Sequence, residues 1–172
     1  MGSQSAVPQA ILEGGPVINT TGGQESTSRL PERTIALTFD DGPDPEWTPK
    51  ILEVLRDNDA HGTFFVVGSQ VARHPGLTRK IVAEGNELGL HTFTHPNMQA
   101  LPPWRRDLEL SQNQMAIARA TGIRTNLARF PYSSRNGAID DVNWRLIKEA
   151  GGLGYLVVVN DRDSRDWERP GI

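Results

Sequence analysis

Short apolar runs alternate with longer segments of helical periodicity along most of the chain. The runs rich in β-branched and aromatic residues predict five strands: Thr34–Phe39, Thr63–Val67, Glu87–Leu90, Thr125–Phe130 and Tyr155–Val159. These runs begin about every 30 residues, which is the usual length of a βαβ unit. The pattern therefore predicts an α/β fold with a parallel sheet. Periodicity alone leaves open whether the sheet is doubly wound or forms part of a barrel.

The segments between these runs carry signals for the start and end of helices. Thr48 is expected to cap a helix whose first turn contains Pro49. Gly85 and Gly122 are expected to end the next two helices. Apolar residues at helical spacing between Ile139 and Ala150 predict the last helix. Each predicted strand is thus followed or preceded by a helix, as βαβ units require.

The first part of the chain has a different texture. Residues 1–33 are dominated by Gly, Ser, Thr, Gln and Pro, and no hydrophobic period is sustained there. We expect residues 1–33 to form an irregular N-terminal lead-in or linker and residues 34–172 to form one domain.

Composition narrows the possible partners and chemistry. The 172 residues include 18 Lys and Arg against 21 Asp and Glu, and no basic stripe interrupts this balance, so no nucleic-acid partner is expected. Cysteine is absent, so a metal site must use His, Asp or Glu. The apolar runs are far shorter than the ~18 residues of a membrane span, and the chain carries no signal-peptide pattern. We therefore expect no membrane span in this chain.

Unusual polar residues cluster at the carboxyl ends of the predicted strands. The first strand ends in Asp40 and Asp41, and His91 and His95 follow the third. Arg129 lies near the end of the fourth predicted strand. Asp166, Trp167, Pro131 and Tyr132 also lie after predicted strands. In parallel α/β proteins that face collects ligand and catalytic groups, whether the sheet is open or closed.

Two histidines four residues apart, together with an acidic turn on the same face, fit a site of two His and one carboxylate. Each feature has a purely structural alternative: an Asp-Asp-Gly turn is common, the histidines can lie in a surface loop, Arg129 can pair with Asp166, and Trp167 can simply pack. The zincin motif is excluded because Thr92 stands where its Glu is needed. All these features lie at the carboxyl ends of the predicted strands, and this shared location favours a metal site.

Four motifs follow one another along the chain: Thr-Phe-Asp-Asp-Gly, His-Thr-x-x-His, Arg-x-Pro-Tyr and Asp-x-x-Asp-Trp. In this order they resemble the polysaccharide deacetylase family, also called the NodB-homology or carbohydrate esterase family 4 domain, from about Thr34 to Trp167. The resemblance implies a distorted (β/α) barrel. It also implies a hydrolase that removes acetyl groups, with a metal, from N-acetylglucosamine-containing polysaccharide such as chitin, peptidoglycan or a related cell-envelope glycan.

The resemblance assigns roles to individual residues. It implies that Asp41, His91 and His95 bind one divalent metal ion, with Zn²⁺ preferred over Co²⁺ or another divalent ion. It further implies that Asp40 is the catalytic base and that the Tyr132 backbone N–H stabilises the oxyanion.

The remaining family positions are implied to support the base and the substrate. Arg129 and Asp166 would orient the base. Pro131 and Trp167 would contact the substrate, with Trp167 lining the acetyl pocket.

The sequence departs from the family after these motifs. The family's fifth motif, a strand leading to a His that acts as general acid, is not found before Ile172, and about five βα units fall short of a full barrel. We therefore expect a C-terminally incomplete domain that is weakly active or inactive, in which the Tyr155–Val159 strand lacks its next neighbour.

Two runs, Asp41–Pro49 and Pro131–Ser134, are similar to deacetylase segments of larger bacterial envelope proteins that also carry a glycosyltransferase. This similarity implies an extracellular or outward-facing, membrane-associated location.

Two further hypotheses belong to other classes of protein. An inactive, deacetylase-like carbohydrate-binding module would bind metal without turnover. An unrelated doubly wound binding domain, in which the motifs are incidental, would bind no stoichiometric metal.

Overall fold

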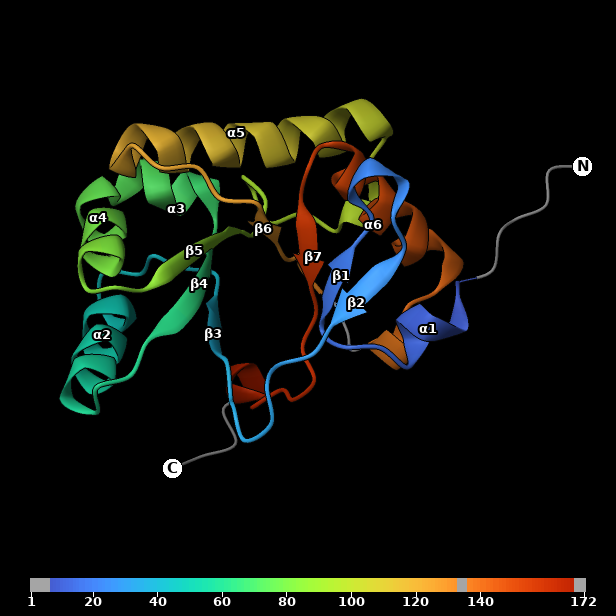
Figure 1. Cartoon of the computed structure of the whole chain (residues 1–172). Helices are drawn as coiled ribbons and strands as arrows, with labels where there is room; N and C mark the ends of the chain where they lie inside the picture. Colours follow the sequence, from blue (N-terminus) through green and yellow to red (C-terminus); the bar gives the residue numbers. More distant parts are fainter. Residues whose placement is uncertain (1–6, 133–135, 169–172) are drawn as a thin grey trace, which may run out of the picture.

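A computed structural model describes residues 7–132 and 136–168. In these residues the strands form one sheet in the order β2-β1-β7-β6-β5-β4-β3 (Figure 1). The strands are β1 (Val17–Asn19), β2 (Ser26–Ser28), β3 (Leu37–Asp40), β4 (Gly62–Val66), β5 (Glu87–Leu90), β6 (Leu127–Ala128) and β7 (Leu156–Val158). Strands β3 to β7 are the five predicted ones, and each is parallel to its neighbour. The predicted α/β fold with a parallel sheet is therefore confirmed.

Helices surround this curved sheet (Figure 1). They are α1 (Gln9–Leu12), α2 (Trp47–Asp57), α3 (Gly68–Arg73), α4 (Pro75–Ala83), α5 (Pro103–Thr121) and α6 (Asp141–Gly152). Short 3₁₀ turns are η1 (Thr21–Gly23), η2 (Met98–Ala100), η3 (Asn136–Ala138) and η4 (Asp166–Glu168). The predicted helix ends at Gly85 and Gly122 are confirmed, because both glycines adopt the positive φ that follows a helix C-terminus.

The expectation of an irregular lead-in over residues 1–33 is wrong for part of that segment. Strand β1 pairs antiparallel with β7, with Ile18 opposite Val157, and β2 pairs with β1. The side chain of Ile18 is fully buried in the core. Three-residue strands between glycines are too short to show a hydrophobic period, which is why the sequence pattern did not predict them. The strand β7, expected to lack a neighbour, therefore has β1 at that edge.

The start of α2 also differs from the prediction. Thr48 lies inside the helix, and its hydroxyl accepts a hydrogen bond from the Asp44 backbone N–H at 2.8 Å. The Asp44 carboxylate accepts from the Trp47 N–H, also at 2.8 Å. Asp44 rather than Thr48 therefore satisfies the free N–H groups at the helix start, since either side chain can supply an oxygen acceptor there.

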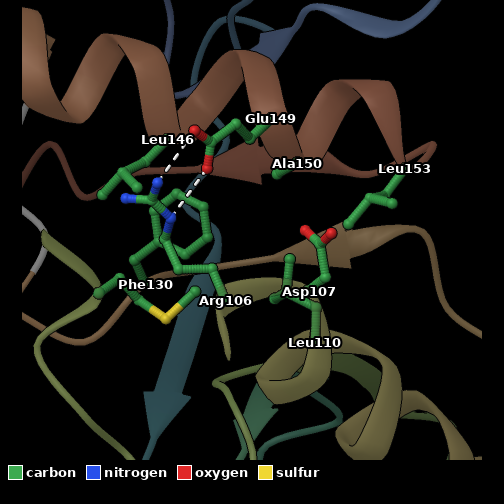
Figure 2. Close-up of a pocket in the computed structure, with 9 residues that line it drawn as sticks. Arg106, Asp107, Leu110, Phe130, Leu146, Glu149, Ala150 and Leu153 are labelled. Atoms are coloured by element: carbon green, nitrogen blue, oxygen red, sulfur yellow. Dashed lines mark hydrogen bonds and ion pairs between the residues drawn. The ribbon is translucent and has the colours of Figure 1, made fainter. Parts of the chain in front are cut away.

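An ion pair and an aromatic ring join α5 to α6. Figure 2 shows Arg106 of α5 reaching Glu149 of α6 beside the ring of Phe130. The Nε of Arg106 lies 2.9 Å from Oε2 of Glu149, and Phe130 is buried. Phe130 therefore fills the core between these two helices and the sheet.

Helix α3 begins at a glycine because space is lacking there. A Cβ on Gly68 would lie 2.5 Å from the Phe93 ring and 3.0 Å from the Asn113 Cα, closer than packed atoms approach. The absence of a side chain brings the start of α3 against α5 and against the loop after β5.

Candidate metal centre

Three side chains with metal-binding atoms converge at the carboxyl ends of β3 and β5. Asp41 follows β3, His91 follows β5, and His95 lies four residues further on. One ligand atom from each lies within 4.8 Å of the others. Oδ1 of Asp41 is 3.3 Å from Nε2 of His91 and 3.0 Å from Nε2 of His95. One carboxylate and two imidazoles are a donor set suited to a borderline-soft divalent cation such as Zn²⁺.

The surroundings of His91 leave the correct ring nitrogen available. Its Nδ1 lies 2.9 Å from the backbone carbonyl oxygen of Arg129, and that oxygen can only accept a hydrogen bond. Nδ1 therefore donates to this carbonyl, and Nε2, which faces Asp41, is the ring nitrogen left to bind a metal ion. Such a partner on the outer ring nitrogen is typical of metal-binding histidines. The site residues therefore fit a metal ion by geometry as well as by residue type.

The imidazoles also act on the carboxylate. The hydrogen bond from His91, with the charges of His91 and His95, holds the pKa of the Asp41 carboxyl below its usual value, although burial opposes this shift. Asp41 thus stays ionised, which is the form that binds a cation.

Four residues at this site have left-handed backbone conformations. The φ angles of Asp41, Thr92, His95 and Tyr132 are 71°, 63°, 59° and 59°. Non-glycine residues seldom adopt such angles, and each costs about 1–3 kcal/mol. The surrounding contacts must therefore hold these residues in place, and together they aim the ligand side chains at one point.

Arg129 occupies the interior of the curved sheet beside the cluster. Its guanidinium donates to Asp40 and to Thr38 of β3 at 2.9 Å each, and to the Val158 carbonyl of β7 at 3.2 Å. The group also stacks on the Phe65 ring, 4.2 Å from its centroid. One buried side chain next to β6 thereby connects the two outer strands of the parallel part of the sheet and fixes the orientation of Asp40.

Pro131 and Tyr132 border the cluster on one side. Pro131 is buried, whereas the Tyr132 side chain is 75% exposed and places its ring edge-on to His95, with centroids 5.2 Å apart. Among the described residues, the Tyr132 backbone N–H has no hydrogen-bond acceptor. Ser133 and Ser134, which belong to the same sequence run, lie outside the described residues.

The structure does not bring Asp166 and Trp167 to this cluster. Both lie in η4 and are exposed, Trp167 by 69%. Asp166 accepts a hydrogen bond from the Ser164 hydroxyl, and no hydrogen bond or ion pair among the described residues joins it to Arg129 or Asp40. The carboxylate partner of Arg129 is therefore Asp40 rather than Asp166.

The sequence did not predict a role for two buried polar residues that contact the loop between His91 and His95, called the histidine loop below. Glu109 and Asn113 lie one turn apart on α5 and contact the loop residues Thr92, Phe93 and Thr94. A signal was present: both share the helix face of the core residues Ile117 and Ala120, where a polar residue needs a specific partner.

Of the helices in the described part of the chain, none has both the length and the apolar character needed to cross a bilayer.

Comparisons with known proteins point in one direction. The chain matches the polysaccharide deacetylase family model over residues 27–153. It is 37% identical over 142 residues to a chitooligosaccharide deacetylase of Sinorhizobium fredii, covering 81% of this chain and 62% of the relative. It is 35% identical over 143 residues to a peptidoglycan-N-acetylglucosamine deacetylase of Bacillus cereus, covering 82% and 63%.

A solved structure agrees with the sequence matches. A family 4 carbohydrate esterase from Streptomyces lividans, in complex with acetate, superposes with a TM-score of 0.68 and 35% identity over 80% of this chain and 67% of that chain. The chain thus has the distorted barrel-like fold of these enzymes, and it spans about three fifths of the length of the two curated relatives.

Proposed function

This chain belongs to the polysaccharide deacetylase family, and from that premise we propose that it hydrolyses acetyl groups from N-acetylglucosamine-containing polysaccharide with the help of one divalent metal ion. The family relatives named for chitooligosaccharide and for peptidoglycan support this substrate class. The products are free acetate and an amino sugar within the polymer.

One observation carries the proposal: the Asp41, His91 and His95 cluster lies directly beside a second carboxylate that is held by a buried arginine. Amide hydrolysis needs an activated water, a base for its proton and a group that stabilises the oxyanion. A metal site with a separate, fixed carboxylate next to it provides for the first two of these needs.

Asp41, His91 and His95 would hold the metal ion, for which Zn²⁺ is our first choice. Bound there, such an ion supplies a water of lowered pKa and polarises the acetyl carbonyl. The exposed side of Asp41 leaves the cluster open to solvent and hence to a large polymer.

Asp40 acts as the base. Its carboxylate accepts the proton of the attacking water, while the hydrogen bond from Arg129 holds it in position. Breaking the C–N bond then needs a proton on the leaving nitrogen, so the proton taken from water returns to the amine side of the reaction.

The Tyr132 backbone N–H donates to the developing oxyanion. A fixed donor aimed at that oxygen contributes about 3 kcal/mol to lowering the barrier in acyl-transfer enzymes. The left-handed conformation of Tyr132 and the contact of its ring with His95 fix this peptide next to the cluster.

The envelope glycan named for the Bacillus cereus relative supports action outside the cytoplasm. We propose that the chain works at the cell surface or beyond it, as part of a larger envelope protein.

The deciding experiment compares the two adjacent carboxylates. Asp41→Asn should abolish stoichiometric Zn²⁺ binding, whereas Asp40→Asn should keep Zn²⁺ and release acetate from N-acetylglucosamine oligomers about 10² to 10⁴ times more slowly. The exposed Asp57 provides the matched control, Asp57→Asn.

The outcomes separate the alternatives. Wild-type protein that binds both Zn²⁺ and N-acetylglucosamine oligomers but releases no acetate would contradict hydrolysis by this chain and favour a carbohydrate-binding module. Loss of Zn²⁺ in Asp40→Asn would reverse the assigned roles, and wild-type protein without Zn²⁺ would contradict the metal site.

A further inference from the structure

We propose that Glu109 of α5 is a positioning residue that sets the spacing of the two metal-binding histidines by holding the loop between them. The inference rests on the proposed metal site, and it concerns a residue outside the four sequence motifs.

The Glu109 carboxylate makes four contacts, three of them with the loop. Its Oε2 accepts the backbone N–H groups of Phe93 and Thr94 at 2.8 Å and 2.7 Å. Its Oε1 accepts the Thr94 hydroxyl at 2.7 Å and lies 3.1 Å from the Arg105 guanidinium. These donors fill the acceptor sites that a carboxylate offers.

The burial of the Glu109 carboxylate makes its hydrogen bonds important. Glu109 is 1% exposed, and a buried carboxylate is tolerated only where charge and hydrogen bonds compensate its lost hydration. Conversely, without Glu109 the part-buried N–H groups of Phe93 and Thr94 lose their carboxylate acceptor. The loop would then move to find other partners.

The loop has no regular structure to hold it, so neighbouring elements supply the partners. The N–H groups of Gly68 and Ser69 donate to the carbonyls of Thr92 and Phe93 at 3.0 Å and 2.9 Å. Asn113 adds a 2.8 Å hydrogen bond to the Thr92 carbonyl. Helices α3 and α5 thus bind the loop carbonyls.

The N–H groups of the loop are held by side-chain oxygens. Glu109 binds those of Phe93 and Thr94, and the Thr92 hydroxyl accepts the His95 N–H at 3.1 Å. Because Phe93 and Thr94 lie between His91 and His95, a shift of these two peptides changes the distance between the imidazoles.

A second glutamate offers a control. Glu149, whose side chain is 38% exposed, also pairs with an arginine of α5, through one hydrogen bond and one ion-pair contact, but its partner Arg106 lies in the contact between α5 and α6 (Figure 2). Changes at Glu149 and Glu109 should both lower stability. Only the Glu109 change should alter metal binding.

The test measures Zn²⁺ and Co²⁺ affinity, the Co²⁺ absorption spectrum and thermal unfolding without metal. Glu109→Leu should weaken metal affinity by about 10- to 100-fold, the range found for lost outer-shell partners. Glu109→Gln keeps one oxygen for the loop N–H groups but loses the charge, so it should fall between Glu109→Leu and wild type, at about three- to tenfold. Glu149→Leu and Glu149→Gln should leave affinity and spectrum unchanged.

If Glu109→Leu does not fold, the comparison of Glu109→Gln with Glu149→Gln decides alone. Equal metal affinity in those two proteins and wild type would overturn the positioning role, even if both variants lose stability. Absence of metal from wild type would instead contradict the proposed function, which keeps the two failures distinguishable.

Discussion

Two groups of residues lie at the carboxyl ends of strands in the same sheet. Only one of these groups forms a cluster of side chains in contact. The cluster after β3, β5 and β6 brings Asp40, Asp41 and Arg129 into contact with one another or with the histidines. The segment after β7 has comparable residue types, Asp166 and Trp167, yet they lie exposed in η4.

The difference lies in what holds each segment. The histidine loop is bound from α3 and α5, and Asp40 is bound by a buried arginine. The η4 segment is held by short local contacts, such as Ser164 with Asp166 and Asp163 with the Arg165 N–H. In this chain, the segment after a strand that other elements contact is the one whose polar side chains converge.

The largest effect should come from removing a ligand. His91→Ala removes one of three donor atoms and leaves the Arg129 carbonyl without its partner. Loss of an outer-shell partner lowers metal affinity by about 10- to 100-fold, and we expect a larger fall here because a ligand itself is lost. Metal analysis after chelation and reloading measures this loss, with the exposed His61→Ala as control. Equal metal content in wild type and His91→Ala would show that this cluster is not the metal site. The contrast with η4 would then no longer hold.

An intermediate effect should follow from Arg129→Leu. This change leaves Asp40 and Thr38 without their donor and removes the connection to β7. Because Asp40 is partly exposed, we expect destabilisation near the lower limit for broken buried pairs, about 3 kcal/mol. Urea unfolding of metal-free protein measures it, and unchanged stability would mean that Arg129 does not hold the two strands together.

The smallest effect should come from the η4 segment. Asp166→Asn and Trp167→Ala should leave metal affinity unchanged and the free energy of unfolding within about 0.5 kcal/mol of wild type. Isothermal titration and urea unfolding check both quantities. A tenfold loss of acetate release at unchanged metal affinity would sharpen the comparison, because it would show that substrate draws η4 to the cluster.

Much of this arrangement follows from the sequence pattern, for identifiable reasons. The strands β3 to β7 are apolar runs at regular spacing, and residues at their carboxyl ends share one face. The convergence of Asp41, His91 and His95 could therefore be predicted.

Other features could not be predicted because they depend on long-range packing. Strand β1 pairs with β2 and β7, which are distant in the sequence or as short as itself, and its three residues carry no period of their own. The role of Glu109 depends on which loop lies against α5, and a helix pattern shows only that the residue faces inward.

The left-handed backbone at Asp41, Thr92, His95 and Tyr132 has a consequence for directed evolution of this protein. Glycine adopts such angles freely, so glycine at any of the four sites relieves an unfavourable conformation worth about 1 kcal/mol or more. A library selected only for heat resistance of the metal-free protein would then enrich variants that have lost the Asp41 or His95 ligand, or the Thr92 hydroxyl that accepts the His95 N–H. Screens of this protein should therefore select for bound metal together with thermal resistance.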